Sequence, residues 1–283
     1  FIGYMNKRLM FSAALVMALL SANAQKRAFT IEDLYRVKGL SSVSLSPDGK
    51  TVCYTASSSD LKSQKSGSDI YIMNADGSHT KALTEDGKSS SAVWSKDGKS
   101  IFFTNNEKGT AQIFRMDLTT CETEQVTDYE LGIGSPVISP DERYIAFTAE
   151  VYPDLGADAK ANKARMEKKE QGPVQAHIAD KLLYRHWTSY NDGRCNHLIL
   201  FDTQTKTYKD LTPGNYSLIF VVGGGITYQF SPDSKEICFV SNHDEHQEAS
   251  TNADLWTVSV NGGRTGLHYE GEQGLGWYSC LFA

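Results

Sequence analysis

The sequence has few cysteines and no large excess of either charge. It holds 34 acidic and 28 basic residues, a net charge of -6, and a chain with this balance is not expected to bind nucleic acid. Its five cysteines include no C-x-x-C pair, and Cys53 and Cys238 stand inside short apolar runs, where cysteine packs as a small hydrophobe. We therefore predict no disulfide framework.

The motifs that carry catalytic or cofactor chemistry are also missing. No serine lies in G-x-S-x-G, the turn that presents the nucleophile of an α/β-hydrolase. The run His243-Asp244-Glu245-His246 offers too few ligands for a metal without a third one elsewhere, and the glycines at 223–225 lack the lysine of a phosphate-binding loop. We predict no catalytic residue, metal or cofactor within this chain.

Only one long apolar run occurs, and it lies near the start. Residues 9–20 are apolar, follow Lys7 and Arg8, and precede the small residues at 21–24. This order is typical of a secretory signal peptide, here residues 5–24 with cleavage after Ala24. Because the run is shorter than the roughly 20 residues that cross a bilayer, we expect an exported protein, in a bacterial periplasm, with no membrane span after cleavage.

A repeat of roughly 46 residues organises the rest of the chain. Turns related to Ser-Pro-Asp-Gly-Lys occur at residues 46–50, 95–99, 139–143 and 231–235. Each is followed by an apolar run, then by a third strand-like segment and, in several copies, by a fourth that ends in Leu-Thr or Val-Thr. Four short strands per repeat predict an all-β fold, an incomplete β-propeller over residues 28–265. We count about five blades, begun near residues 41, 90, 134, 184 and 227.

Two segments depart from the repeat. Residues 151–181 form an insertion in which 157–170 are strong helix formers, so we predict a mostly solvated helix at a blade edge; long insertions in repeat proteins tend to gather on the functional face. After Gly263 the repeat calls for another Leu-Thr strand end, which residues 266–283 do not supply. We predict a non-native tail there, created by a frameshift near Thr265.

The non-repetitive parts resemble a known family. Residues 29–34, 147–154, 172–177, 183–187 and 211–216 are similar to the bacterial dipeptidyl-peptidase 5 and acylaminoacyl-peptidase-like branch of the prolyl oligopeptidase family. The resemblance implies a substrate-gating propeller followed by an α/β-hydrolase domain with a Ser-Asp-His triad, acting on dipeptides or acylated residues of short peptides. By this resemblance the chain is truncated before its catalytic domain, and its partners would be short peptides and that domain. A homodimer of the full-length parent stays open, because the sequence does not determine the oligomeric state.

The resemblance also suggests a substrate-binding site. In such enzymes acidic side chains of the propeller hold the free amine of a peptide, and Glu150, at the end of a strand where the insertion begins, is the candidate. Arg185 and Trp187 would line the same cavity. The alternatives are a structural ion pair for Arg185 and a core aromatic for Trp187. A second function stays open, a non-enzymatic, TolB-like periplasmic propeller that binds proteins, although such a scaffold would not need the insertion.

Overall fold

The computed structural model describes residues 27–179, 182, 184–186, 188–218, 227–250 and 252–269. The predicted signal peptide, Trp187 and residues 270–283 lie outside this range. By its contacts the chain divides into two units, a small one made of residues 1–39 and 58–66 and a large one that holds the rest. Within the small unit, helix α2 (Ile31–Leu34) begins with a capping box between Thr30 and Asp33, and Arg27 forms an ion pair with Asp33.

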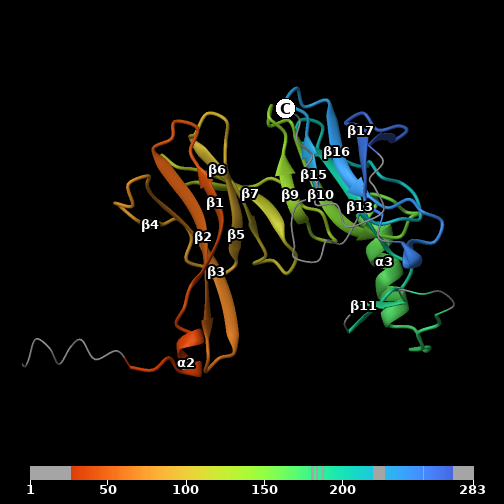
Figure 1. Ribbon diagram of the computed structural model, residues 1–283, viewed down its shortest axis with the longest axis horizontal. Coiled ribbons are helices and arrows are strands. Elements are labelled where there is room, and N and C mark those ends of the chain that lie inside the picture. Colours follow the sequence, from red (N-terminus) through yellow and green to blue (C-terminus); the bar gives the residue numbers. More distant parts are fainter. Residues whose placement is uncertain are drawn as a thin grey trace, which may run out of the picture. The chain divides into compact units, whose positions relative to one another are not determined.

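Apart from one two-stranded hairpin, the described strands form four antiparallel sheets of four strands each, which we call blades 1 to 4 (Figure 1). Blade 1 contains β1 (Gly39–Leu45), β2 (Thr51–Asp60), β3 (Lys65–Asn74) and β4 (Lys81–Ala82), and blade 2 contains β5 (Ser89–Trp94), β6 (Ser100–Asn105), β7 (Gln112–Asp117) and β8 (Thr123–Gln125). Blade 3 contains β9 (Gly134–Ile138), β10 (Tyr144–Val151), β13 (Cys195–Asp202) and β14 (Thr207–Asp210). Blade 4 contains β15 (Tyr228–Phe230), β16 (Glu236–Ser241), β17 (Asp254–Ser259) and β18 (Gly266–Tyr269). The all-β, propeller-type fold predicted from the repeat is confirmed.

The recurring Ser-Pro-Asp-Gly-Lys turn is held by its own side chains. The Ser46 hydroxyl donates to Asp48, whose carboxylate accepts the backbone N–H of Lys50, and Ser46 Oγ accepts the backbone N–H of Thr51 at 2.9 Å. The same bonds recur at the turns that begin with Ser95, Ser139 and Ser231. Each serine and aspartate thus satisfies backbone donors that a tight turn would otherwise leave unpaired.

The threonines at the ends of the fourth strands have an equally local role. The hydroxyl oxygens of Thr84, Thr127 and Thr212 accept the backbone N–H groups of Ile70, Ile113 and Leu198 in the third strands, at 3.0, 2.9 and 2.9 Å. The threonine of the recurrent Leu-Thr or Val-Thr pattern therefore forms a hydrogen bond that links the end of the blade to its third strand.

Three apolar clusters lie between successive blades. The cluster between blades 1 and 2 includes Ile70 and Ile101, the next includes Phe102 and Phe147, and the cluster between blades 3 and 4 includes Leu198 and Phe239. Several of these side chains, such as Phe147 and Phe239, are wholly buried, and burial of such a residue contributes about 1.5–3 kcal/mol. The sheets are thus stabilised mainly by packing face to face against their neighbours.

The insertion lies inside blade 3, and this corrects the predicted number of blades. Strand β10 pairs with β13 along its whole length, from Tyr144 opposite Asp202 to Val151 opposite Cys195. Helix α3 (Ala159–Glu170) and a hairpin of β11 (Arg185–His186) and β12 (Ser189–Tyr190) stand between these two strands in the sequence. The sequence predicts a separate blade beginning near residue 184. The structure has the β11–β12 hairpin there, followed by β13 and β14, which belong to blade 3. The described residues therefore form four blades and not five.

The end of blade 4 differs from its predicted boundary. The sequence places the propeller's end at residue 265, whereas Gly266–Tyr269 form β18, the fourth strand of blade 4, with Gly266 opposite Thr257. The rest of the predicted tail is outside the described residues. No helix in the described part of the chain has the length and apolar character needed to cross a membrane, and Cys53, Cys121 and Cys195 are free cysteines.

Candidate functional site

Glu150 lies at the end of strand β10, where the chain leaves blade 3 for the insertion. Its side chain is 64% exposed, and its carboxylate forms an ion pair with Arg194, with 3.1 Å between Oε2 and Nη1. Arg194 also holds Asp192, with 2.9 Å between Nε and Oδ1. One guanidinium is therefore shared by two carboxylates that come from opposite ends of the insertion.

Two residues complete this group, which we call the blade 3 charge cluster: Glu150, Tyr152, Lys169, Asp192 and Arg194. The Tyr152 hydroxyl donates to the other carboxylate oxygen of Asp192 at 3.1 Å. The Lys169 ammonium, from the last turn of α3, donates to the backbone carbonyl of Asp192 at 2.8 Å. The strand, the helix and the returning chain thus meet at Asp192.

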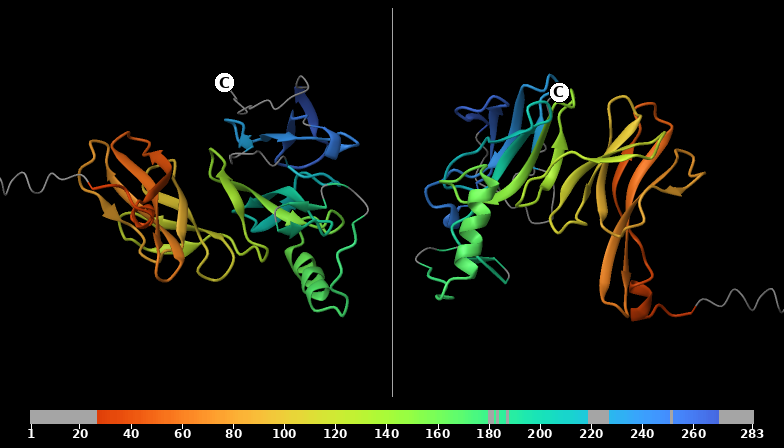
Figure 2. Two further views of the ribbon diagram at one scale, coloured as in Figure 1. Left: turned by 60° about the horizontal axis from the view of Figure 1, so that its bottom comes forward. Right: turned by 180° about the vertical axis from the view of Figure 1, so that it is seen from behind.

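Helix α3 projects from blade 3 (Figure 2), and polar contacts anchor it beside this cluster. The wholly buried Asn162 accepts the backbone N–H of Tyr152 and donates to the carbonyls of Gly156 and Asp158. Arg165 binds Asp154 through two hydrogen bonds of 2.7 Å. A helix with little apolar surface is positioned here by hydrogen bonds rather than by a hydrophobic face.

Asp192 and Arg194 stabilise each other in their ionised forms. Burial would raise the pKa of Asp192, but hydrogen bonding and charge from Arg194 outweigh it, so the pKa lies below its usual value. Burial would lower the pKa of Arg194, yet the hydrogen bond and the charge of Asp192, with the charge of Glu150, keep it above its usual value. Asp192 and Arg194 therefore stabilise each other as a charged pair.

The structure describes two of the three predicted site residues, Glu150 and Arg185. Glu150 is exposed at the start of the insertion, as described above, and Arg185 is an exposed residue of β11 that pairs with Tyr190. Trp187 lies outside the described residues. In the part of the chain that the structure describes, no contact joins Arg185 to Glu150, so the predicted common cavity stays a prediction. Sequence reasoning missed Asp192 and Arg194, because an ion pair across the insertion leaves no local motif in the sequence.

A second buried pair lies in the same blade, at the start of β13. His197 Nδ1 is 2.7 Å from Asp210 Oδ2, and Nε2 is 2.9 Å from the Gly214 carbonyl. Burial would lower the pKa of His197, but the hydrogen bond to Asp210 and further hydrogen bonds outweigh it and raise the pKa to about 9. With an acceptor at each nitrogen the ring is a cation and cannot act as a general base; its role is structural.

The residues that invited a metal interpretation do not converge. His243 lies between two aromatic rings, with ring centres 3.9 Å from those of Tyr216 and Trp256. No group of three or more potential ligands gathers among the described residues.

Two family models match this chain, one over its first part and one over its second part. The TolB beta propeller domain matches residues 22–171, and the dipeptidyl peptidase IV N-terminal region matches residues 157–283. Dipeptidyl-peptidase 5 of Porphyromonas gingivalis is 29% identical over 246 residues, which is 84% of this chain and 35% of the relative. The chain belongs to the TolB β-propeller family, as an N-terminal propeller of the prolyl oligopeptidase type. The second match includes residues 266–283, which the sequence analysis places outside the propeller.

Further relatives also match most of this chain over a smaller part of their own length. An uncharacterised peptidase of Bacillus subtilis is 25% identical and matches 82% of this chain and 34% of its own length. The acylaminoacyl peptidase of Pyrococcus horikoshii is similar in structure, with a TM-score of 0.60 at 18% identity over 86% of this chain and 34% of its own. TolB of Acinetobacter baumannii has a TM-score of 0.50 at 21% identity over 82% and 43%. At these identities the two structures show the fold alone. The chain spans about a third of the length of the curated relatives it matches.

Proposed function

We propose that this propeller gates substrate entry for an exported serine peptidase that removes dipeptides or acylated residues from short peptides. The nucleophile would belong to an α/β-hydrolase domain outside this sequence, because no serine here lies in G-x-S-x-G. Export follows from the predicted signal peptide at residues 5–24. The peptidase relatives that match most of the chain support the reaction class.

The observation that carries the proposal is the exposed Glu150 at the anchored end of the insertion. Arg194 fixes one side of its carboxylate, and the carboxylates of Glu150 and Asp192 share that single guanidinium. Among the described residues no second cation pairs with Glu150, because Lys169 contacts the backbone carbonyl of Asp192 and not a carboxylate. Glu150 is also the more exposed of the two carboxylates. A peptide ammonium would bind there, and this contact would set how many residues extend toward a nucleophile.

The test is a binding experiment with this chain. The dipeptide amide Ala-Phe-NH₂ and its N-acetyl form would be titrated into the purified protein and followed by two-dimensional NMR. A charged hydrogen bond contributes about 1.5–3 kcal/mol, so acetylation should weaken binding roughly tenfold or more. Glu150→Gln should weaken binding of the free amine and remove the difference between the two peptides. Glu167→Gln, at an exposed position of α3, is the matched control and should change nothing.

The possible results separate the two functions. Equal binding of both peptides to the unaltered protein would refute the role of Glu150 in holding an amine. Binding of a folded periplasmic protein, with no binding of either peptide, would favour the alternative, a TolB-like scaffold, which the TolB domain match supports.

A further inference from the structure

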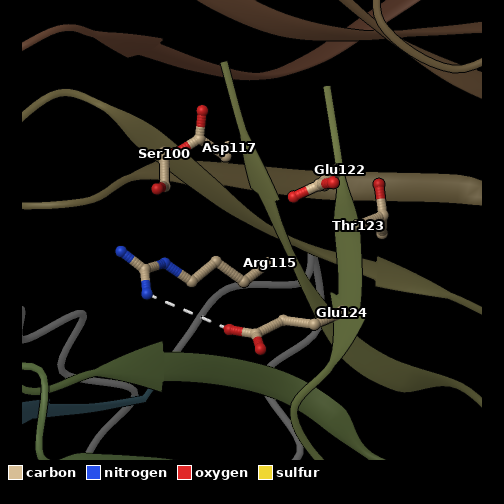
Figure 3. Close-up of a pocket in the computed structure, with 6 residues that line it drawn as sticks. All are labelled: Ser100, Arg115, Asp117, Glu122, Thr123 and Glu124. Atoms are coloured by element: carbon tan, nitrogen blue, oxygen red, sulfur yellow. Dashed lines mark ion pairs between the residues drawn. The ribbon is translucent and has the colours of Figure 1, made fainter. Parts of the chain in front are cut away.

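Blade 2 contains a cavity of about 590 Å³ that is separate from the blade 3 charge cluster (Figure 3). It is lined by Ser100, Arg115, Asp117, Glu122, Thr123 and Glu124, which come from β6, β7, β8 and the turn before β8. In Figure 3 the Glu122 side chain points into the space between Arg115 on one side and Ser100 and Asp117 on the other. The volume is in the range of small-molecule sites.

Arg115 has hydrogen-bonding capacity that the described residues do not use. Its Nε is buried and has no hydrogen-bond partner there. Its nearest anion is Glu124, with 3.9 Å between Nη1 and Oε1, which is longer than a hydrogen bond. The guanidinium carbon lies 5.7 Å from the centre of the Phe102 ring, and the charge of Arg115 helps to lower the pKa values of Asp97 and Asp117. A guanidinium held in this way lacks the planar acceptor that it binds best, a carboxylate or a phosphate.

The other blades show that the fold does not require an arginine here. Arg115 stands opposite Phe102 in the β6–β7 ladder. The equivalent position is Leu200 in blade 3, opposite Ala146, and Thr257 in blade 4, opposite Cys238. A residue that departs from the repeat without serving the fold is a candidate for function.

A small residue borders the cavity beside Arg115. Ser100, five residues after the first serine of its turn, is buried, and the residue at this position is Thr51 in blade 1, the buried Tyr144 in blade 3 and Glu236 in blade 4. The small side chain of Ser100 leaves room beside Arg115 that a tyrosine would not.

The charges of the lining residues indicate the net charge of the ligand that would bind. Asp117 already accepts the backbone N–H groups of Thr119 and Thr120 at 2.8 and 3.0 Å. Glu122 and Glu124 remain as acceptors for a cation, beside the one guanidinium that would take a carboxylate. With three carboxylates and one guanidinium in the lining, a ligand with more positive than negative charge fits best.

We propose that this cavity binds a basic α-amino acid, with its carboxylate on Arg115 and its ammonium and side-chain cation on Glu122 and Glu124. This inference does not rest on the proposed function, because it involves another blade and none of the residues of the blade 3 charge cluster.

Isothermal titration calorimetry of the full chain with L-arginine tests the proposal. L-arginine should bind saturably, whereas L-argininamide, which lacks the carboxylate, and L-glutamate should bind at least roughly tenfold more weakly. Arg115→Leu introduces the residue that blade 3 carries, and it should weaken L-arginine to the level of the amide without affecting the amide itself. Glu122→Gln should weaken both cationic ligands.

Two further variants keep the outcome interpretable. Glu107→Gln, at an exposed loop position outside the cavity, and Glu150→Gln should both leave L-arginine binding unchanged, so failure here is distinguishable from failure of the proposed function. Absence of saturable L-arginine binding to a protein with native circular dichroism, or an Arg115→Leu variant that still prefers arginine to argininamide, would overturn the proposal.

Discussion

Raising the pH above neutrality is expected to destabilise the protein through His197. The imidazole is wholly buried between Asp210 and the Gly214 carbonyl, and its pKa is raised from 6.5 to about 9. The folded state binds the proton more tightly than the unfolded state does. The contribution of His197 to the free energy of unfolding is therefore fully present below pH 6.5. It is lost as the pH rises from 6.5 through 9.

The size of the effect follows from the shift in pKa. One pKa unit corresponds to about 1.4 kcal/mol, so a rise of this extent contributes on the order of 3 kcal/mol to the free energy of unfolding. That is a large part of the stability of an ordinary domain, which is about 5–15 kcal/mol. Loss of the proton would leave a buried Asp210 carboxylate without its cation, which is costly.

The measurement compares urea unfolding of the unaltered chain and of His197→Gln at several values between pH 6 and pH 9.5. Glutamine is chosen because Gln112 occupies the same position in blade 2, where its side chain bonds the Tyr129 backbone. The difference in unfolding free energy between the two proteins should decrease by about 3 kcal/mol across this range. Other titrating groups cancel in the difference. A difference that does not change with pH would refute a charged His197.

Two further predictions concern positions that serve the fold. Cys121 in blade 2 is exposed and has a left-handed backbone with a φ of 59°, and Lys206 in blade 3 has a φ of 56°. Glycine adopts this conformation without steric cost, so Cys121→Gly and Lys206→Gly should each raise the free energy of unfolding in urea by about 0.5 kcal/mol. Cys121→Ala should not raise it. Asn162→Ala should cost about 2–3 kcal/mol because it removes the acceptor of the Tyr152 backbone N–H and the side-chain donor to the Gly156 carbonyl. Hydrogen exchange should then speed up in α3 before the blades, and unchanged protection of α3 would contradict the anchoring role.

The sequence by itself determined the unit of the fold. The serine and aspartate of each turn bond to backbone groups within five residues, and the threonine that ends a blade bonds to the adjacent third strand. Such contacts recur wherever the motif recurs, so a single sequence is enough to find them. The helix at 157–170 was visible for the same reason, since helix formation depends largely on neighbouring residues.

Only the tertiary structure decided which strands share a sheet and which charges meet. Val151 and Cys195 are opposite one another across the whole insertion, and a repeat counted along the chain cannot distinguish one divided blade from two. The pairing of Glu150 and Asp192 through Arg194 depends on that closure, because residues far apart in sequence become neighbours only when β10 and β13 form hydrogen bonds. The cavity of blade 2 likewise arises from two side chains on separate strands, Ser100 and Arg115, whose proximity is set by strand register and not by sequence spacing.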